Sequence, residues 1–237
     1  MPTVDLNWSK NAAVGVSGVS DFDDAREAAE STQGSTNTTS ANILSVRFIL
    51  STGRGGAQYG FTRSYLAFDF TGYTTGTITN LAFHWTGTTT SSGGQTVRAV
   101  KTTAFGSNTN FSNYVSTDWW DSLDMSTVYT TSGFTWADST SAQSTSLNSA
   151  AITFAQSNSY LQFALVNNPY DYSGINPGTS TTQTSYGNWS SNKMFLRFTY
   201  ADAAYNRKVN SIVAASSNKI DSVVYTDVSK INSIAPS

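Results

Sequence analysis

Hydrophobic and polar residues alternate most clearly across residues 63–70. Leu66, Phe68 and Phe70 fall on one side of an extended strand, and the residues between them fall on the other. Glycine-rich segments flank this stretch on both sides, and such segments mark turns. The pattern therefore predicts a core strand, bounded by turns, that has one buried face.

Similar short patterns recur along the chain, and they predict a series of strands. We expect these strands at residues 4–8, 43–50, 77–86, 95–102, 133–136, 149–154, 160–166 and 193–200. Among them, 149–154 and 160–166 are expected to pair across the polar residues that separate them. Many short alternating strands with polar turns predict an all-β fold, either an antiparallel sandwich or a barrel.

Three segments depart from the strand pattern. Residues 21–30 are expected to form one short helix, because their early aspartates suit a helix N-terminus. Residues 31–42 are rich in Ser, Thr, Asn and Gly, and residues 168–188 are rich in Tyr, Gly, Pro and Thr. We expect both of these segments to be surface loops.

The composition favours the all-β prediction. Of the 237 residues, 13% are aromatic and only 12% are charged, against about 25% charged residues in ordinary domains. Helix surfaces normally need Glu, Lys and Arg, so the low charge disfavours a helical protein. A sandwich of this length can form a single domain. We therefore expect one large domain over residues 1–203, with a long polar loop around 20–42, and a C-terminal extension over 204–237.

Charge, cysteine content and the N-terminal sequence exclude several classes of function. The net charge is −2 with no basic run, which argues against nucleic-acid binding. The chain has no cysteine, which excludes disulfides, zinc–thiolate sites and thiol catalysis. Residues 1–5 are polar, so we expect no Sec signal peptide and synthesis in the cytoplasm. No apolar run approaches the roughly 18 residues that span a bilayer, so we expect no membrane partner.

An internal repeat begins after Ala204. Its lysines stand at 208, 219 and 230, a spacing of 11 residues, and each opens a similar segment. Such a period suits a right-handed helical coil, but the β-branched, Ser- and Asn-rich content disfavours helix, so a β-type extension stays equally open. About thirty residues cannot form a core alone.

The apolar positions of the repeat therefore need a partner surface, which predicts attachment to another chain or oligomerisation. These positions are Val209, Ile212, Val213, Ile220, Val223, Val224, Ile231 and Ile234. The alternative is that the tail packs as a strand on its own sandwich.

The order of motifs resembles a DNRLRE-type jelly-roll domain, a group found in carbohydrate-binding-like modules and microbial surface proteins. The matching segments are 63–70, 77–81, the region of Trp119, 134–136, 160–163 and 195–200, within residues 43–200. This resemblance implies an antiparallel jelly-roll β-sandwich. It also implies a role in adhesion or glycan contact, without a shared catalytic site.

The tail is similar to Lys-Val-Asn-Gly-Val repeats at the ends of phage structural proteins, with Ser in place of Gly. This resemblance implies a virion protein of the capsid-decoration or fibre type, displayed on the particle surface. The tail would join it to other virion proteins, and a homotrimer is compatible with this arrangement. The alternative is a carbohydrate-binding module or tail-fibre adhesin that recognises a surface polysaccharide.

The candidate chemistry is sparse, so we expect no enzyme. His84 is the only histidine, and no nucleophile-elbow sequence accompanies it. Two acidic stretches could supply a carboxylate pair for glycan hydrolysis or oxygen ligands for calcium. They contain Asp118, Asp121 and Asp124, and Asp21, Asp23, Asp24 and Glu27. Acids in loops are usually solvated or cap helices, so we expect no catalytic residue and no metal or cofactor, with calcium as the alternative.

Five aromatic residues are the better candidates for ligand binding. They are Trp119, Trp120, Tyr170, Tyr172 and Trp189. Tyr and Trp offer rigid contact area, and the Asn and Asp beside them offer hydrogen bonds. A sugar or a neighbouring subunit would use the same residues. The alternative, that Tyr170 and Tyr172 cover an edge of their own sandwich, stays open.

Overall fold

The computed structural model describes residues 2–28, 33–37, 44–87, 95–106, 120–137, 140–187 and 193–201, with backbone alone at 33–37, 44 and 185–187. The described residues belong to one compact unit that ends at Ala201. The predicted attachment residues, 209 to 234, lie outside the described residues.

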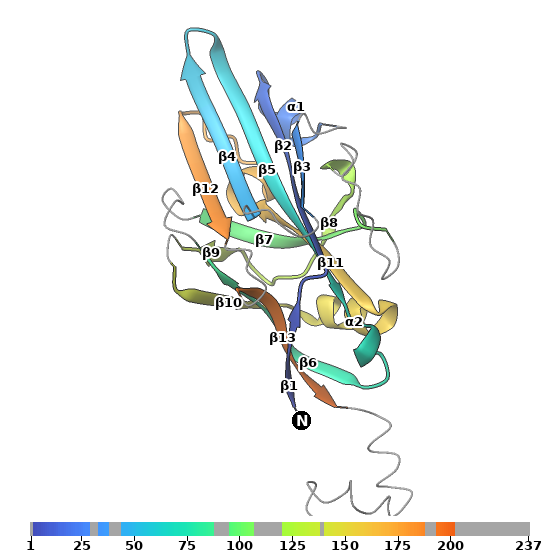
Figure 1. Ribbon diagram of the computed structural model, residues 1–237. Coiled ribbons are helices and arrows are strands. Elements are labelled where there is room, and N and C mark those ends of the chain that lie inside the picture. The colour runs from blue at the N-terminus through green and yellow to red at the C-terminus, as the bar shows by residue number, and fades with distance from the viewer. Residues whose placement is uncertain are drawn as a thin grey trace, which may run out of the picture. The chain divides into compact units, whose positions relative to one another are not determined.

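The unit is built mostly of strands (Figure 1). Its strands are β1 (Thr3–Asn7), β2 (Lys10–Val19), β3 (Gln33–Asn37), β4 (Leu44–Gly53), β5 (Gly56–Asp69), β6 (Thr77–Thr86), β7 (Gln95–Thr102), β8 (Leu123–Val128), β9 (Phe134–Trp136), β10 (Ala142–Ser146), β11 (Tyr160–Asn167), β12 (Thr181–Gly187) and β13 (Met194–Ala201). Its helical elements are α1 (Phe22–Arg26), α2 (Ser149–Asn158), the 3-10 turn η1 (Thr71–Tyr73) and the π-helical turn η3 (Asn168–Tyr172).

These strands form two antiparallel sheets. The four-stranded sheet has the order β1-β13-β6-β10, and the nine-stranded sheet has the order β12-β4-β5-β11-β7-β8, with β2, β3 and β9 branching from it. The long strand β5 pairs with β2 along one side and with β4 and then β11 along the other. The all-β prediction is confirmed: the unit is an antiparallel, jelly-roll-like β-sandwich.

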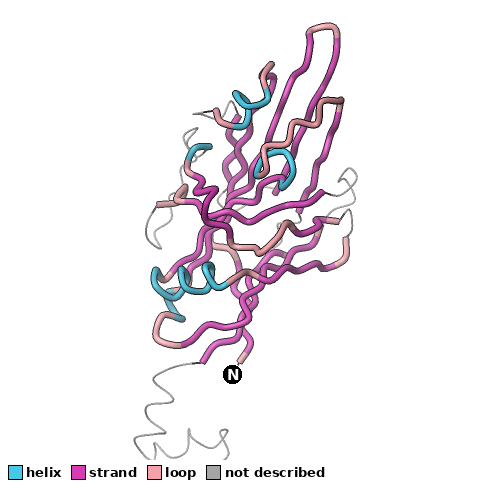
Figure 2. Tube along the Cα trace, turned by 180° about the vertical axis from the view of Figure 1, so that it is seen from behind, coloured by secondary structure: helices cyan, strands magenta, loops and turns pink. Residues whose placement is uncertain are grey.

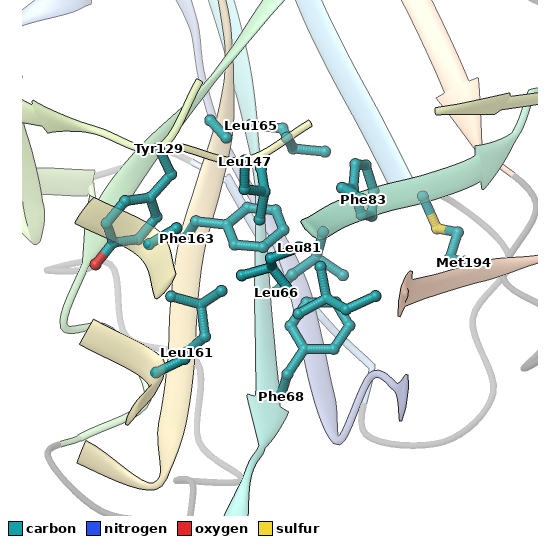
Figure 3. Packing of buried hydrophobic residues seen from close by; sticks show 14 of the residues in the cluster. Leu66, Phe68, Leu81, Phe83, Tyr129, Leu147, Leu161, Phe163, Leu165 and Met194 are labelled. Carbon is teal, nitrogen blue, oxygen red and sulfur yellow. The ribbon is translucent and has the colours of Figure 1, made fainter. Parts of the chain in front are cut away.

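A first hydrophobic core fills the space between the two sheets (Figure 3). Leu66 and Phe68 of β5 and Phe163 of β11 point from the nine-stranded sheet toward Phe83 of β6 and Met194 of β13. The rings of Phe68 and Phe163 stack with their centroids 5.6 Å apart. The alternation read from residues 63–70 therefore identifies the inner face of the sandwich correctly.

The prediction that this strand has only one buried face is wrong. Tyr65 and Ala67 point to the opposite side of the nine-stranded sheet, and both are fully buried there. A second hydrophobic core covers that side, with Phe22 of α1 and Trp120 among its residues. The central strand β11 is likewise buried along its whole length. The cause is tertiary: α1, the segment at Trp120 and η3 pack on the outside of the sheet.

Several predicted elements match the structure. The strands predicted at 77–86 and 95–102 are β6 and β7 with the same boundaries. The helix predicted in 21–30 is α1, and its N-cap is Asp21, which accepts hydrogen bonds from the backbone of Asp23 and Asp24 at 2.9 and 3.1 Å. These elements are confirmed because their signals, alternation and capping, are local.

The predicted strand at 149–154 is wrong, and so is its pairing with 160–166. This segment is the helix α2, whose N-cap Asn148 accepts from the backbone of Ala150 and Ala151. Ala151 and Ala155, four residues apart, pack into the first core as one helical face. Ser159 ends the helix in the left-handed conformation with φ 59°. The partners of β11 are instead β5 and β7.

Several segments predicted as loops or left unassigned contain regular structure. Residues 31–42 include β3, and 168–188 include η3 and β12. The strand β10 pairs with β6 although it is composed of Ala, Gln, Ser and Thr. Polar strands of this kind lack the hydrophobic alternation that marks a strand in a sequence, and only their backbone pairing identifies them.

The start of β1 and the end of β13 lie next to each other, at the end of the sandwich opposite the β4–β5 hairpin (Figures 1 and 2). Strand β1 pairs with β13, with Thr3 opposite Thr199, and the Tyr200 amide donates to the Pro2 carbonyl at 3.1 Å. The chain therefore leaves β13 beside the start of β1. None of the helices in the described part of the chain has the length and apolar character needed to cross a membrane.

Candidate functional site

A pocket opens over the second core, on the outer side of the nine-stranded sheet. Its volume is about 410 Å³. Its lining residues come from the C-terminal end of α1, from β5, and from the segment that leads into β8. They are Arg26, Glu27, Ala28, Arg63, Trp120, Asp121, Leu123 and Met125. The pocket thus combines an aromatic and aliphatic wall with carboxylates and two guanidinium groups.

Arg63 holds the base of this pocket together. Its side chain is 3% exposed and pairs with Asp171, which is 1% exposed. Arg63 Nε and Nη2 donate to the two carboxylate oxygens of Asp171 at 2.9 and 2.7 Å. It also donates to two main-chain carbonyls: Nη1 to Trp120 at 2.8 Å and Nη2 to Arg26 at 2.9 Å. One buried cation therefore joins β5, η3, α1 and the Trp120 segment.

The charge state of this pair follows from the contacts. Burial alone lowers the pKa of the Arg63 guanidinium, but the charge and hydrogen bonds of Asp171 outweigh it and raise the pKa. Burial also raises the pKa of the neighbouring Tyr65, although Arg63 opposes that shift. Arg63 consequently remains a cation and Tyr65 a neutral phenol over the physiological range.

A buried amide positions Asp171. Asn167, the last residue of β11, is the N-cap of η3, and its Oδ1 accepts from the Tyr170 amide at 2.9 Å. Its Nδ2 donates to Gln95 at 2.7 Å and to Gln183 at 2.9 Å. Strands β7, β11 and β12 therefore fix the start of η3, and η3 in turn places Asp171 against Arg63.

Trp120, one of the predicted ligand-binding residues, forms a wall of the pocket. Its indole Nε1 donates to the Arg26 carbonyl at 3.2 Å, and the Arg63 guanidinium carbon lies 3.6 Å from its ring centroid. The side chain is only 1% exposed. One face of the Trp120 ring is therefore covered by the Arg63 guanidinium. The side chain contributes mainly to the packing of the second core.

The other predicted aromatic residues are divided between the sheet and the undescribed parts of the chain. The Tyr170 ring packs on Phe48 with centroids 4.3 Å apart, and the Arg98 guanidinium lies 4.4 Å from the Tyr172 ring centroid. Both tyrosines are partly buried against the second core. Trp119 and Trp189 lie outside the described residues.

The structure brings the two predicted acidic stretches to the same place. Glu27 from one and Asp121 from the other line the pocket. Asp124 instead accepts hydrogen bonds from the amide and hydroxyl of Ser126, which lower its pKa, and lies 3.6 Å from Lys101. Within the described ranges, no three His, Cys, Asp or Glu side chains gather to hold a metal ion. Asp118 lies outside those ranges.

Sequence reasoning missed Arg63 and Asp171, although both stand in segments that it singled out. An Arg in a strand that otherwise carries aromatic and small residues is a usable signal of a buried ion pair. A charged side chain is rarely buried in a core unless it is paired with an opposite charge. Its partner could not be read from the chain, since Asp171 lies 108 residues away.

His84 lies on the outer face of the four-stranded sheet, away from the pocket. Its imidazole stacks on Phe195 with centroids 4.9 Å apart and planes 3° apart. Nearby, Arg197 donates two hydrogen bonds of 2.6 Å to Asp5. Burial lowers the pKa of His84 from its ordinary value of 6.5, and Arg197 lowers it further, while Asp5 opposes the shift.

This shift predicts a pH dependence of stability. The unfolded chain binds a proton at His84 near pH 6.5 and the folded chain only at lower pH, so the free energy of unfolding falls as the pH drops below 6.5. We expect His84→Gln to flatten this slope between about pH 7.5 and about 5.5 in urea titrations. His84 is the only histidine, so no other imidazole contributes. Parallel slopes for the two proteins would contradict the assignment.

Comparison with known proteins identifies no family for this chain. No protein-family model matches it, and no curated protein matches it.

Proposed function

We propose that this chain is a non-enzymatic structural protein of a phage virion, displayed on the particle surface as a capsid-decoration or fibre-type protein. Residues 204–237 attach it to other virion proteins, and a trimer of the chain is compatible with this role. One observation carries the proposal. The pairing of β1 with β13 brings the N- and C-terminal strands of the sandwich together, and the tail of residues 204–237 begins soon after Ala201.

This geometry suits a displayed module. A tail that leaves beside the N-terminal strand can hold one end of the sandwich at a particle and direct the β4–β5 hairpin away from it. The tail supplies apolar residues at an 11-residue spacing, as at Val209, Ile220 and Ile231, and these need a partner surface. The most buried charged groups, Arg63 and Asp171, bind each other, which suits a structural role.

A second candidate function, recognition of a surface polysaccharide, is favoured by the pocket. Its volume of about 410 Å³ falls in the range of small-ligand sites. The exposed carboxylates of Glu27 and Asp121 could accept hydrogen bonds from sugar hydroxyls beside Leu123 and Met125.

Deletion of residues 204–237 tests the first proposal. We expect the truncated chain to fold but to be absent from purified particles, because its attachment residues are removed. Copy number per particle, measured by quantitative mass spectrometry, is the readout. A matched surface change, Arg54→Ala at the tip of the β4–β5 hairpin, is expected to leave the copy number unchanged.

Two outcomes would count against attachment through the tail. One is an unchanged copy number for the truncated chain. The other is that Asp121→Asn, in a full chain with an intact tail, abolishes both retention on host polysaccharide and incorporation into particles. That second outcome would favour the glycan-binding function.

A further inference from the structure

The strand β12 is an open edge of the nine-stranded sheet. It pairs with β4 in an unbroken register from Thr181 opposite Leu50 to Gly187 opposite Leu44. Among the described strands, none pairs with its other side. An edge strand presents a row of backbone N–H and C=O groups to which another strand can hydrogen-bond.

The chemistry of β12 differs from that of the edge strands β8, β1 and β10. Natural edge strands are usually short, charged, irregular or covered, and these features prevent unwanted pairing. The register of β8 shifts and the strand carries Asp124. In β1, five residues long, Asp5 is bound by Arg197. In β10, also five residues long, the Gln143 side chain hydrogen-bonds to the Ala137 backbone.

Within the described residues, β12 has none of the protections found in β8, β1 and β10. Its seven residues include no charge and no proline, and its pairing with β4 has no bulge. Thr182 is exposed on it, and β-branched threonines suit an extended strand. The free edge of β12 is therefore suited to pair with a further strand.

We propose that β12 receives a C-terminal repeat segment from a neighbouring copy of this chain, by strand addition. The segments 208–213, 219–224 and 230–235 are rich in β-branched residues, and each has one charge or two. Their six-residue length suits a strand of seven residues. Main-chain hydrogen bonds give such pairing its affinity, and side chains on alternate positions give its specificity.

The proposed attachment role favours pairing between copies. Each chain has one β12 edge and three repeat segments, so in any assembly one segment per chain can occupy such an edge. A segment that occupies the edge of a neighbour joins the two copies, whereas a segment on its own β12 joins nothing. This inference rests on the proposed function, in which the tail is the attachment segment.

The test is self-association of the full chain, measured by sedimentation velocity. We expect the mass to rise with concentration, and Thr182→Lys to weaken association by about tenfold or more. A lysine on an edge strand disfavours pairing with a further strand, and natural edge strands use it for this purpose. Ser144→Lys is the matched control, because Ser144 is exposed on the edge strand β10 and should leave association unchanged.

Hydrogen exchange supplies a second readout. The backbone amides of residues 181–187 should exchange more slowly as the full chain is concentrated, and this added protection should disappear in the Thr182→Lys variant. A chain that stays monomeric up to about 100 µM would overturn the inference. So would association that Thr182→Lys does not weaken, or association without added protection of β12.

The two proposals fail in different ways. If the tail deletion abolishes particle incorporation while Thr182→Lys leaves self-association unchanged, the tail attaches elsewhere and strand addition at β12 is wrong. If Thr182→Lys abolishes self-association while the tail deletion leaves the copy number unchanged, the proposed particle attachment is wrong and strand addition stands.

Discussion

Replacing Arg63 with methionine is expected to lower the free energy of unfolding by about 3–5 kcal/mol. The substitution leaves the Asp171 carboxylate buried without its cation, and Asp171 is only 1% exposed. It also removes the hydrogen bonds to the Trp120 and Arg26 carbonyls and the contact with the Trp120 ring. Urea unfolding followed by tryptophan fluorescence measures the loss.

Two variants serve as controls for this prediction. Arg197→Met breaks the ion pair between Arg197 and Asp5. This pair also has two hydrogen bonds but is solvent-exposed, so we expect little change in the free energy of unfolding. The double variant Arg63→Met with Asp171→Leu removes both buried charges and should recover part of the lost stability. An Arg63→Met protein within about 1 kcal/mol of the wild type would show that the pair does not hold the second core.

Replacing Phe68 with alanine is expected to cost about 3–5 kcal/mol. The Phe68 ring is fully buried between the two sheets and stacks on Phe163, so its loss leaves a cavity that rigid strands on both sides cannot fill. The same urea experiment measures the change. Because Phe68 and Arg63 lie on the same strand, we expect each substitution to shift a single unfolding transition.

A matched change of the same residue type isolates the effect of burial. Phe195 lies on the outer face of the four-stranded sheet, where it is partly exposed and stacks on His84. We expect Phe195→Ala to cost clearly less than Phe68→Ala, since no enclosed cavity forms there. Equal losses for the two variants would contradict the assignment of Phe68 to the main core.

Much of the fold was predictable because its signals are local. Alternation identified Leu66 and Phe68 as an inner face, and the capping aspartate Asp21 identified α1. The helix α2 was misread because Ile152 and Phe154 stand two residues apart on either side of Thr153, while the helical signals are an Asn cap and two alanines. In so short an apolar segment, strand and helix patterns are hard to separate.

The candidate site was predictable only in part. Trp120 and the acidic stretches with Glu27 and Asp121 stood out in the sequence, and the fold brings them to one pocket. The residues that organise this pocket, Arg63 and Asp171, did not stand out. Their pairing depends on a contact between β5 and η3 across 108 residues, and no local pattern encodes such a contact.

The sequence by itself determined which residues of the strand at 63–70 share a face, because side chains alternate along any extended strand. It also revealed the repeated tail, since a repeat is a property of the sequence alone. Only the tertiary structure decided what lies against each face. Packing α1, Trp120 and η3 on the outer side of β5 buried Tyr65, paired Arg63 with Asp171 and created a second core. Burial depends on what covers a face, and here the covering segments come from distant parts of the chain.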